Sequence, residues 1–455
     1  MSETPALHRS LRLRSVVLFG VAYMAPMIVL GTFGVVAAET SGSVPTAYLL
    51  AMVAMLFTAH SYGKMAAAHP VAGSAYTYTR RTLDSRAGFL VGWAVLLDYF
   101  FLPMVIWLLG GTYLQAQFPA VPFWLWIVAF IAATTCLNVL GIKVADKANY
   151  LLMAFQVLVI VIFVLLSLRH VFHTSGAGAL LSAEPFLNPA TTAAGVSAGA
   201  ALAAYSFLGF DAVTTLTEET VDPRRTMPRA ILLITLIGGG IFVVVAYATQ
   251  LAHPGSAFAD ADSAVFEIAR TIAGDAVAAL LLAGLVVAQF SSGLAAQAGA
   301  ARLLFAMGRD DVLPRRLFGR VHPRFRTPAV NIALTGAVGL VAMFLDVSTS
   351  TSFINFGAFV AFTAVNLSVI GLFLRRRKEG EALPWWSHVL LPGIGALIDL
   401  WLLVNLDPAA LTLGIGWLVL GTAYLAYRTS LFRLPPPETQ DTPDPHPAAE
   451  PHPTR

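Results

Sequence analysis

The chain has 455 residues, of which 57% are hydrophobic and only 12% charged, and its mean hydropathy is +0.74. A soluble domain carries about a quarter of its residues as charges, so this composition excludes an ordinary soluble protein and indicates an integral membrane protein. The formal net charge is +3, but the basic residues lie between apolar runs, which argues against nucleic acid as a partner.

Twelve apolar runs are each close to the length of about 20 residues that crosses a bilayer. The sequence therefore predicts an all-α integral membrane protein with twelve transmembrane helices, in a domain over 15–430 that follows a polar N-terminus, 1–14. The predicted spans are 15–38, 44–67, 87–117, 122–141, 148–168, 192–217, 230–252, 276–307, 328–346, 350–374, 385–405 and 408–428.

The distribution of Lys and Arg predicts the topology. With the N-terminus inside, 26 of the 28 basic residues fall in cytoplasmic segments or at the inner ends of the spans that flank them, and only Arg169 and Arg270 fall outside. Because cytoplasmic loops are enriched in Lys and Arg, we expect both termini in the cytoplasm.

The first span contains a predicted helix break, because Pro26 and the segment Gly31–Gly34 interrupt its apolar run. Carbonyls that end the first half, from Tyr23 to Ala25, would face an ammonium group or another cation. Amides of Gly31, Thr32 and Phe33 would suit a carboxylate through the helix dipole. The alternative is an ordinary proline kink packed against neighbouring helices.

Asp98 lies in the third span, at a depth of about 15 Å from its inner edge, near the middle of the hydrocarbon core. An acid at this depth indicates a site for a substrate amine or for a coupled proton. The alternative is a protonated carboxyl that is hydrogen-bonded within the bundle.

The sixth span breaks at Phe207–Phe210 and leaves Asp211 inside the membrane. Asp211 would either bind a substrate amine or cap the free amides of the following half-helix, and capping is the favoured interpretation. Phe207 and Phe210 would close over a cation or simply fill space. Two interrupted spans in corresponding halves of a chain point to the binding site of a secondary transporter.

The ends of the apolar runs give three further predictions. Glu218 and Glu219 lie close to Arg224 and Arg225, and would form a cytoplasmic ion-pair gate or a plain solvated helix end. The outer segment 252–275 carries four acids and predicts a short surface helix. The proline-rich tail, 431–455, predicts cytoplasmic disorder.

The chain lacks the sequence patterns of several enzyme classes. It contains no GxxxxGK[ST] phosphate loop and no HExxH metal pair. Its one GxSxG match, GVSAG at 195–199, lies within an apolar span and not at the strand-to-helix turn that a nucleophile elbow needs. We therefore expect no catalytic residues, no metal site and no cofactor. A repeated Glu-Thr pair, Glu39-Thr40 and Glu219-Thr220, hints at an inverted repeat whose halves are 15–168 and 192–374, followed by two extra helices over 385–428.

Three sequence blocks resemble the amino acid–polyamine–organocation (APC) superfamily. They are Ala22–Pro26 with Gly31–Gly34, GFDAVTTLTEE over 209–219, and ARLLFAMGRDDVLP over 301–314. The segments AGSAYTYTRR (72–81) and GFLVGWAVLLDYFFLPM (88–104) are most similar to bacterial putrescine importers. The resemblance implies a LeuT-type fold, with a 5+5 inverted repeat and discontinuous helices 1 and 6, in the inner membrane of a bacterium.

The resemblance also implies uptake of a small amine or amino acid, driven by a proton gradient or by sodium. Phe210, Glu218 and Glu219 would take part in gating. Residues carried over as substrate-binding are Tyr23, Ala25, Met27, Gly31, Thr32, Asp98, Ser206, Phe207, Leu208, Gly209, Asp211 and Phe290.

Two departures from the importer pattern keep alternatives open. Putrescine importers tend to carry an aspartate where this chain has Gly31, and its loss favours an amino acid. The fifth span lacks a lysine found in some proton-coupled relatives, so the coupling ion is open. Putrescine or a related polyamine is the first expectation, and an amino acid permease or an amino acid/amine exchanger is the second. A transporter-like receptor is the remote third.

Overall fold

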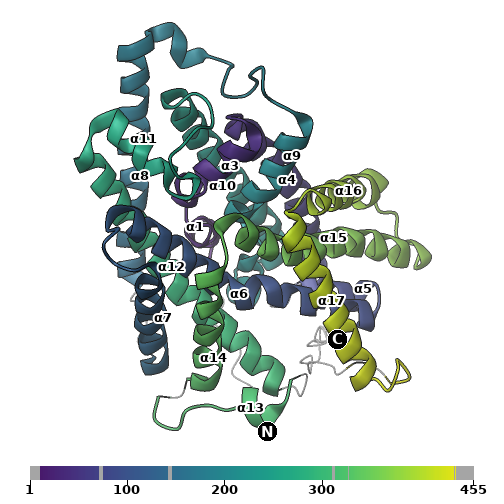
Figure 1. The fold of residues 1–455 in the computed structure, drawn as a ribbon. Coiled ribbons are helices and arrows are strands. Elements are labelled where there is room, and N and C mark those ends of the chain that lie inside the picture. Colours follow the sequence, from purple (N-terminus) through teal and green to yellow (C-terminus); the bar gives the residue numbers. More distant parts are fainter. Residues whose placement is uncertain are drawn as a thin grey trace, which may run out of the picture.

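The computed structural model describes residues 11–70, 75–141, 146–309, 313–325, 327–434 and 436, with only the backbone at 146–150, 218, 306 and 309. Within these residues it is all-helical, apart from one isolated bridge between Leu11 and Thr220 (Figure 1). Eleven helical spans are long and apolar enough to cross a membrane, and a shorter apolar span covers 329–344. The prediction of an all-α protein with twelve spans is confirmed.

The first six spans follow the predicted limits closely, and the fifth reaches further than predicted, to Ser175. The helices of the first half, including the short α5 and η1, are α1 (Leu13–Tyr23), α2 (Ile28–Gly31), α3 (Phe33–Thr40), α4 (Val44–Ala68), α5 (Ala75–Thr82), α6 (Ser85–Gln117), α7 (Phe123–Leu140), α8 (Asp146–Ser175), η1 (Ala177–Leu181), α9 (Ala193–Ala203), η2 (Ala204–Phe207) and η3 (Ala212–Glu219).

The second half begins with two long helices and ends with two shorter ones that pack against the side of the bundle (Figure 1). Its helices are α10 (Pro223–Ala252), η4 (Ala261–Ser263), α11 (Ala264–Ala273), α12 (Asp275–Arg309), α13 (Arg315–Phe318), α14 (Ala329–Gly339), η5 (Leu340–Phe344), α15 (Val347–Lys378), η6 (Trp386–Leu390), α16 (Leu391–Val404) and α17 (Pro408–Arg428).

Small residues let the central helices approach one another closely. A Cβ on Gly239 of α10 would crowd Met52 of α4 and the Phe207 ring, and one on Gly357 of α15 would come within 2.5 Å of the Ala94 carbonyl of α6. Because lipid is as apolar as a leucine side chain, helices in a membrane associate through such close packing. The glycines thus position α4, α6, α10 and α15 around the two broken spans.

The described ends of the chain lie at the same end of the bundle. Leu11 donates to the Glu219 carbonyl (3.0 Å), and Arg86, at the start of α6, donates to the Phe432 carbonyl (2.6 Å). A cavity is lined by Lys64, Arg224 and Arg376, from α4, α10 and α15. The part of the surface around these three basic residues is called the basic face below.

The predicted helix in 252–275 is present as α11, but it is packed rather than freely exposed. Five of its residues are buried, and Phe266 contacts the Tyr113 ring at a centroid distance of 5.9 Å. A Cβ on Gly34 of α3 would overlap the Ala261 carbonyl of η4. The segment η4–α11 therefore covers the end of the first span opposite the basic face. Most of the tail that was predicted to be disordered, residues 437–455, lies outside the described residues.

Candidate substrate site

The first span breaks between α1 and α2, over Met24–Met27. Pro26 has no amide to donate, and Ala25 adopts a positive φ of 46°, which is unusual for a residue with a Cβ. The chain turns through short bonds from the Ala25 amide to the Ala22 carbonyl (3.2 Å) and from the Ile28 amide to the Ala25 carbonyl (2.9 Å). The break predicted at Pro26 is confirmed.

The sixth span breaks over Leu208–Asp211, between η2 and η3. Gly209 adopts a φ of 107°, which only glycine takes up readily. Asp211 takes the N-cap position of η3, but its side chain makes no capping hydrogen bond. The carboxylate instead interacts with the backbone at Gly209, Asp211 and Ala212, so the capping role that the sequence favoured stays a prediction.

The two breaks touch each other. A Cβ on Gly209 would overlap the Tyr23 ring, so the absence of a side chain lets the backbone of the second break lie against the end of α1. The two discontinuities, almost 190 positions apart in the sequence, thus form one structural unit.

A small cavity lies at this contact. Its volume of about 10 Å³ is close to what one water molecule requires. The site is therefore closed in this conformation, and a larger ligand needs the two breaks to move apart. The lining residues are Tyr23, Asp98, Tyr99, Leu102, Leu208, Gly209, Asp211 and Ala212.

The cavity carries two acids and no basic side chain among its lining residues. Asp98 and Asp211 are close enough for their carboxylates to repel each other, and the Tyr62 hydroxyl interacts with Asp211. Charges held in a low-dielectric interior need compensation. The arrangement therefore favours protons or a cationic ligand at this position.

A chain of hydroxyl groups also links the two broken spans. The Tyr48 hydroxyl of α4 lies 3.1 Å from Thr32 Oγ1 and 3.1 Å from Ser206 Oγ, and all three residues are buried. Thr32 and Ser206 therefore connect the spans and do not line the cavity.

The predicted carboxylate site at Gly31–Phe33 is not open in this conformation. The Gly31 and Thr32 amides already donate to the carbonyls of Met27 (3.4 Å) and Ile28 (3.0 Å). A Cβ on Gly31 would overlap the Tyr113 hydroxyl, which fills the space beside the glycine. Two of the three amides predicted as free, those of Gly31 and Thr32, are satisfied because the helix resumes at Ile28, before Gly31.

Four more predicted residues lie outside the cavity lining. Ala25 belongs to the first break, and Met27 is buried against Gly284 of α12. Phe207 packs edge-on against Phe242 at a centroid distance of 5.1 Å. Phe290 is half-buried on α12. Sequence reasoning placed them near the site but did not resolve which side chains reach it.

Phe210 belongs to a buried aromatic cluster with Tyr62, Tyr78 and Phe362. The Phe210 ring lies 5.7 Å from Tyr62 and 5.3 Å from Phe362, and Tyr62 lies 6.1 Å from Tyr78. Phe210 is adjacent in sequence to two cavity residues, whereas Tyr62 is two positions from Lys64 of the basic face. The cluster thus extends from the cavity toward the basic face.

The predicted ion-pair gate at Glu219 does not form in this conformation. Within the described residues, Glu219 makes no ion pair, and Arg225 pairs instead with Asp222, at 3.8 Å and largely in solvent. The Glu219 carbonyl accepts the Leu11 amide. The Glu218 side chain lies outside the described residues.

Tyr99, Leu102 and Ala212 line the cavity but are not among the residues that the sequence predicted as substrate-binding. Their positions relative to the two acids could have predicted them. Residue 102 lies one helical turn after residue 98, and Ala212 directly follows Asp211.

Comparisons with known proteins agree with this architecture. The family model described as amino acid permease matches residues 15–392, which include both breaks. The low-affinity putrescine importer PlaP of Escherichia coli is 44% identical over 96% of this chain and 97% of its own length. The branched-chain amino acid permease BcaP of Bacillus subtilis is 26% identical over 92% of this chain and 93% of its own length. The methylthioribose transporter of the same species is 27% identical over 94% of this chain and 95% of its own length.

Proposed function

Because this chain belongs to the amino acid permease family of the APC superfamily, we propose that it imports putrescine or a related polyamine across a bacterial inner membrane by proton symport. Its family and its relatives are permeases and transporters, so the protein is a membrane transporter and not an enzyme. The observation that carries the choice of substrate is the pair of carboxylates, Asp98 and Asp211, at the contact between the two helix breaks.

A LeuT-type arrangement fits these observations. The broken spans are the first and the sixth, which are corresponding positions if the chain consists of the inverted repeats 15–168 and 192–374 with two extra helices over 385–428. Transporters of this kind bind their substrate where discontinuous helices meet.

The chemistry of the cavity suits an ammonium group. Asp98 and Asp211 supply negative charge, and the rings of Tyr23 and Tyr99 supply faces that attract cations. Carbonyls at the end of α1 complete the set of acceptors. A diamine needs more space than one water, so binding requires Leu208–Asp211 to separate from Tyr23.

Import then requires alternating access through the aromatic cluster. Phe210 and its partners Tyr62 and Phe362 are buried beside the cavity and would separate it from the basic face, which we place in the cytoplasm. One of the two acids would carry the coupled proton, since a carboxylate in the membrane both binds protons and pairs with cations. Sodium is the alternative coupling ion.

Uptake of labelled putrescine into proteoliposomes, with and without an inside-alkaline pH gradient, tests the proposal. We expect uptake that the gradient stimulates and that unlabelled amino acids do not reduce. Sodium-driven uptake would correct the coupling ion alone. Absence of putrescine uptake, together with flux of an amino acid, would overturn the choice of substrate.

An amino acid permease or exchanger is the second candidate. The similarity to a branched-chain amino acid permease favours it, as does Gly31 in place of an acid. The satisfied amides at Gly31 and Thr32 weigh against a carboxylate site there. Uptake that requires solute on the opposite side of the membrane would identify exchange.

A further inference from the structure

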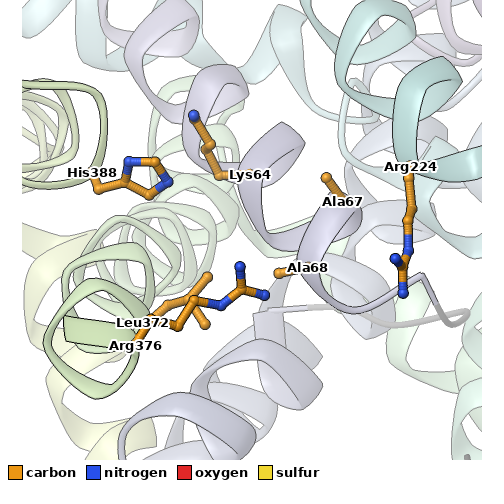
Figure 2. A pocket seen from close by; sticks show the side chains of 7 residues that line it. All are labelled: Lys64, Ala67, Ala68, Arg224, Leu372, Arg376 and His388. Carbon is orange, nitrogen blue, oxygen red and sulfur yellow. The ribbon is translucent and has the colours of Figure 1, made fainter. Parts of the chain in front are cut away.

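The basic face contains a second and much larger cavity, of about 240 Å³ (Figure 2). Its lining includes Lys64 of α4, Arg224 of α10, Arg376 of α15 and His388 of η6, and the remaining lining residues are aliphatic or alanine. Figure 2 shows Lys64 and His388 on one side, Arg224 on the other and Arg376 reaching between them. Three regions that are distant in sequence, α4, α10 and the neighbouring elements α15 and η6, thus bring basic side chains around one space.

The positive charge of this cavity is poorly compensated. No acid is among its described lining residues. Arg376 makes one exposed ion pair with Glu381 (3.4 Å), and Lys64 makes one long hydrogen bond to Ser387 Oγ (3.4 Å). Arg224 makes no ion pair within the described part of the chain. Positive charges that are gathered in a concave site attract an anion.

The walls of the cavity are held in place without a ligand. His388 is buried, and its Nδ1 lies 3.0 Å from both the Pro384 carbonyl and Ser387 Oγ. Lys64 and Arg376 are half-buried near the ends of long helices. The cavity is therefore a built part of the helix bundle and not a chance gap between surface chains.

The position of the cavity matches the depth of lipid phosphates. Trp385 and Trp386, next to His388, are 59% and 55% exposed, and tryptophan favours the interface between lipid and water. Guanidinium groups bind phosphate oxygens in a bidentate manner, and basic pockets between transmembrane helices hold anionic head groups.

We propose that this cavity binds a phosphate group, supplied by the head group of an anionic lipid or by a soluble phosphate. Bound phosphate would join the ends of α4, α10 and α15 on the basic face and stabilise their arrangement. A cationic diamine would be repelled here, so the site is separate from the proposed substrate site and does not depend on the transported solute.

Thermal unfolding of the purified full chain in detergent tests the proposal with three additives: phosphatidylglycerol, phosphatidylcholine and inorganic phosphate. We expect phosphatidylglycerol or inorganic phosphate to raise the unfolding temperature of the wild type saturably, and phosphatidylcholine to do so less. The effective additive identifies the source of the phosphate. Arg376→Gln should weaken the apparent affinity by about fivefold, the loss expected for one basic contact.

Two further variants make the test specific. Arg224→Gln changes an exposed residue at the start of α10, so it tests the cavity even if Arg376→Gln fails to fold. Arg377→Gln removes the same charge from the exposed neighbouring position and should bind like the wild type. Equal affinity in Arg224→Gln and Arg377→Gln, or no saturable shift with either phosphate-bearing anion, would overturn the proposal.

Discussion

At the scale of single residues, Asp98 and Asp211 define the site because they are the two acids that line the cavity between the helix breaks. Neither makes an ion pair with a described residue. An ionisable group at this depth is costly, and a cationic ligand or a proton offsets that cost. We therefore expect the proposed function of the site to depend on the charge of these two side chains and not on their volume.

Asp98→Asn should lower putrescine uptake at low substrate concentration by about a hundredfold, because removing one partner of a buried charge pair costs about 3 kcal/mol. Initial uptake rates in proteoliposomes measure this, with protein levels compared on a gel. Asp275→Asn removes an acid that is 93% exposed and paired with Arg270, so its uptake should be unchanged. Wild-type kinetics in Asp98→Asn would exclude the acid from substrate binding.

Gly209→Ala should abolish uptake and destabilise the fold by roughly 1–3 kcal/mol. The new Cβ would overlap the Tyr23 ring, and alanine is strained at the positive φ of this position. Thermal unfolding and uptake together measure this. Gly240→Ala is the matched control, since no atom lies within 4 Å of a Cβ there. If the two variants behave alike, the contact between the breaks does not matter.

At the scale of elements, the covering segment η4–α11 contains an acid, Asp262, that makes its stability sensitive to pH. Burial, and secondarily the nearby Asp260 and Asp346, raise the pKa of Asp262 to about 6. The folded protein therefore holds the Asp262 proton more tightly than the unfolded chain does. Its contribution to stability is greatest below the ordinary pKa and is lost as the pH rises from about 4 to 6.

Asp262→Asn should remove the loss of stability that accompanies rising pH, because the asparagine side chain does not ionise. We expect the fall in unfolding temperature between pH 5 and pH 7 to be smaller in the variant than in the wild type, measured in detergent. Glu184→Gln, an exposed acid between α8 and α9, should leave the pH dependence unchanged. A pH profile identical in Asp262→Asn and the wild type would show that Asp262 is not responsible.

At the scale of the whole molecule, both described ends and most basic segments gather on one face. Leu11 contacts Glu219, at the end of η3, and Phe432 contacts Arg86, at the start of α6. Twelve spans, an even number, separate the two described ends of the chain, so both ends lie on the same side of the membrane. The side of the membrane on which this face lies follows from the excess of Lys and Arg, which predicts the cytoplasm.

Cysteine labelling in intact cells tests that orientation. In a Cys136→Ser background, which removes the only native thiol, Asp275→Cys should react with a membrane-impermeant thiol reagent. Leu434→Cys should react only after the cells are lysed. The reverse pattern would invert the topology and would place the basic cavity outside the cell.

The number of spans and the two helix breaks follow from the sequence alone, because hydrophobic length, Pro26 and Gly209 act locally. Only the tertiary structure decided which of these features meet. It placed Gly209 against Tyr23, filled the space at Gly31 with Tyr113, and gathered Lys64, Arg224 and Arg376 around one cavity. These contacts join residues from separate helices, and such contacts depend on how helices pack, which the spacing of residues along one helix does not specify.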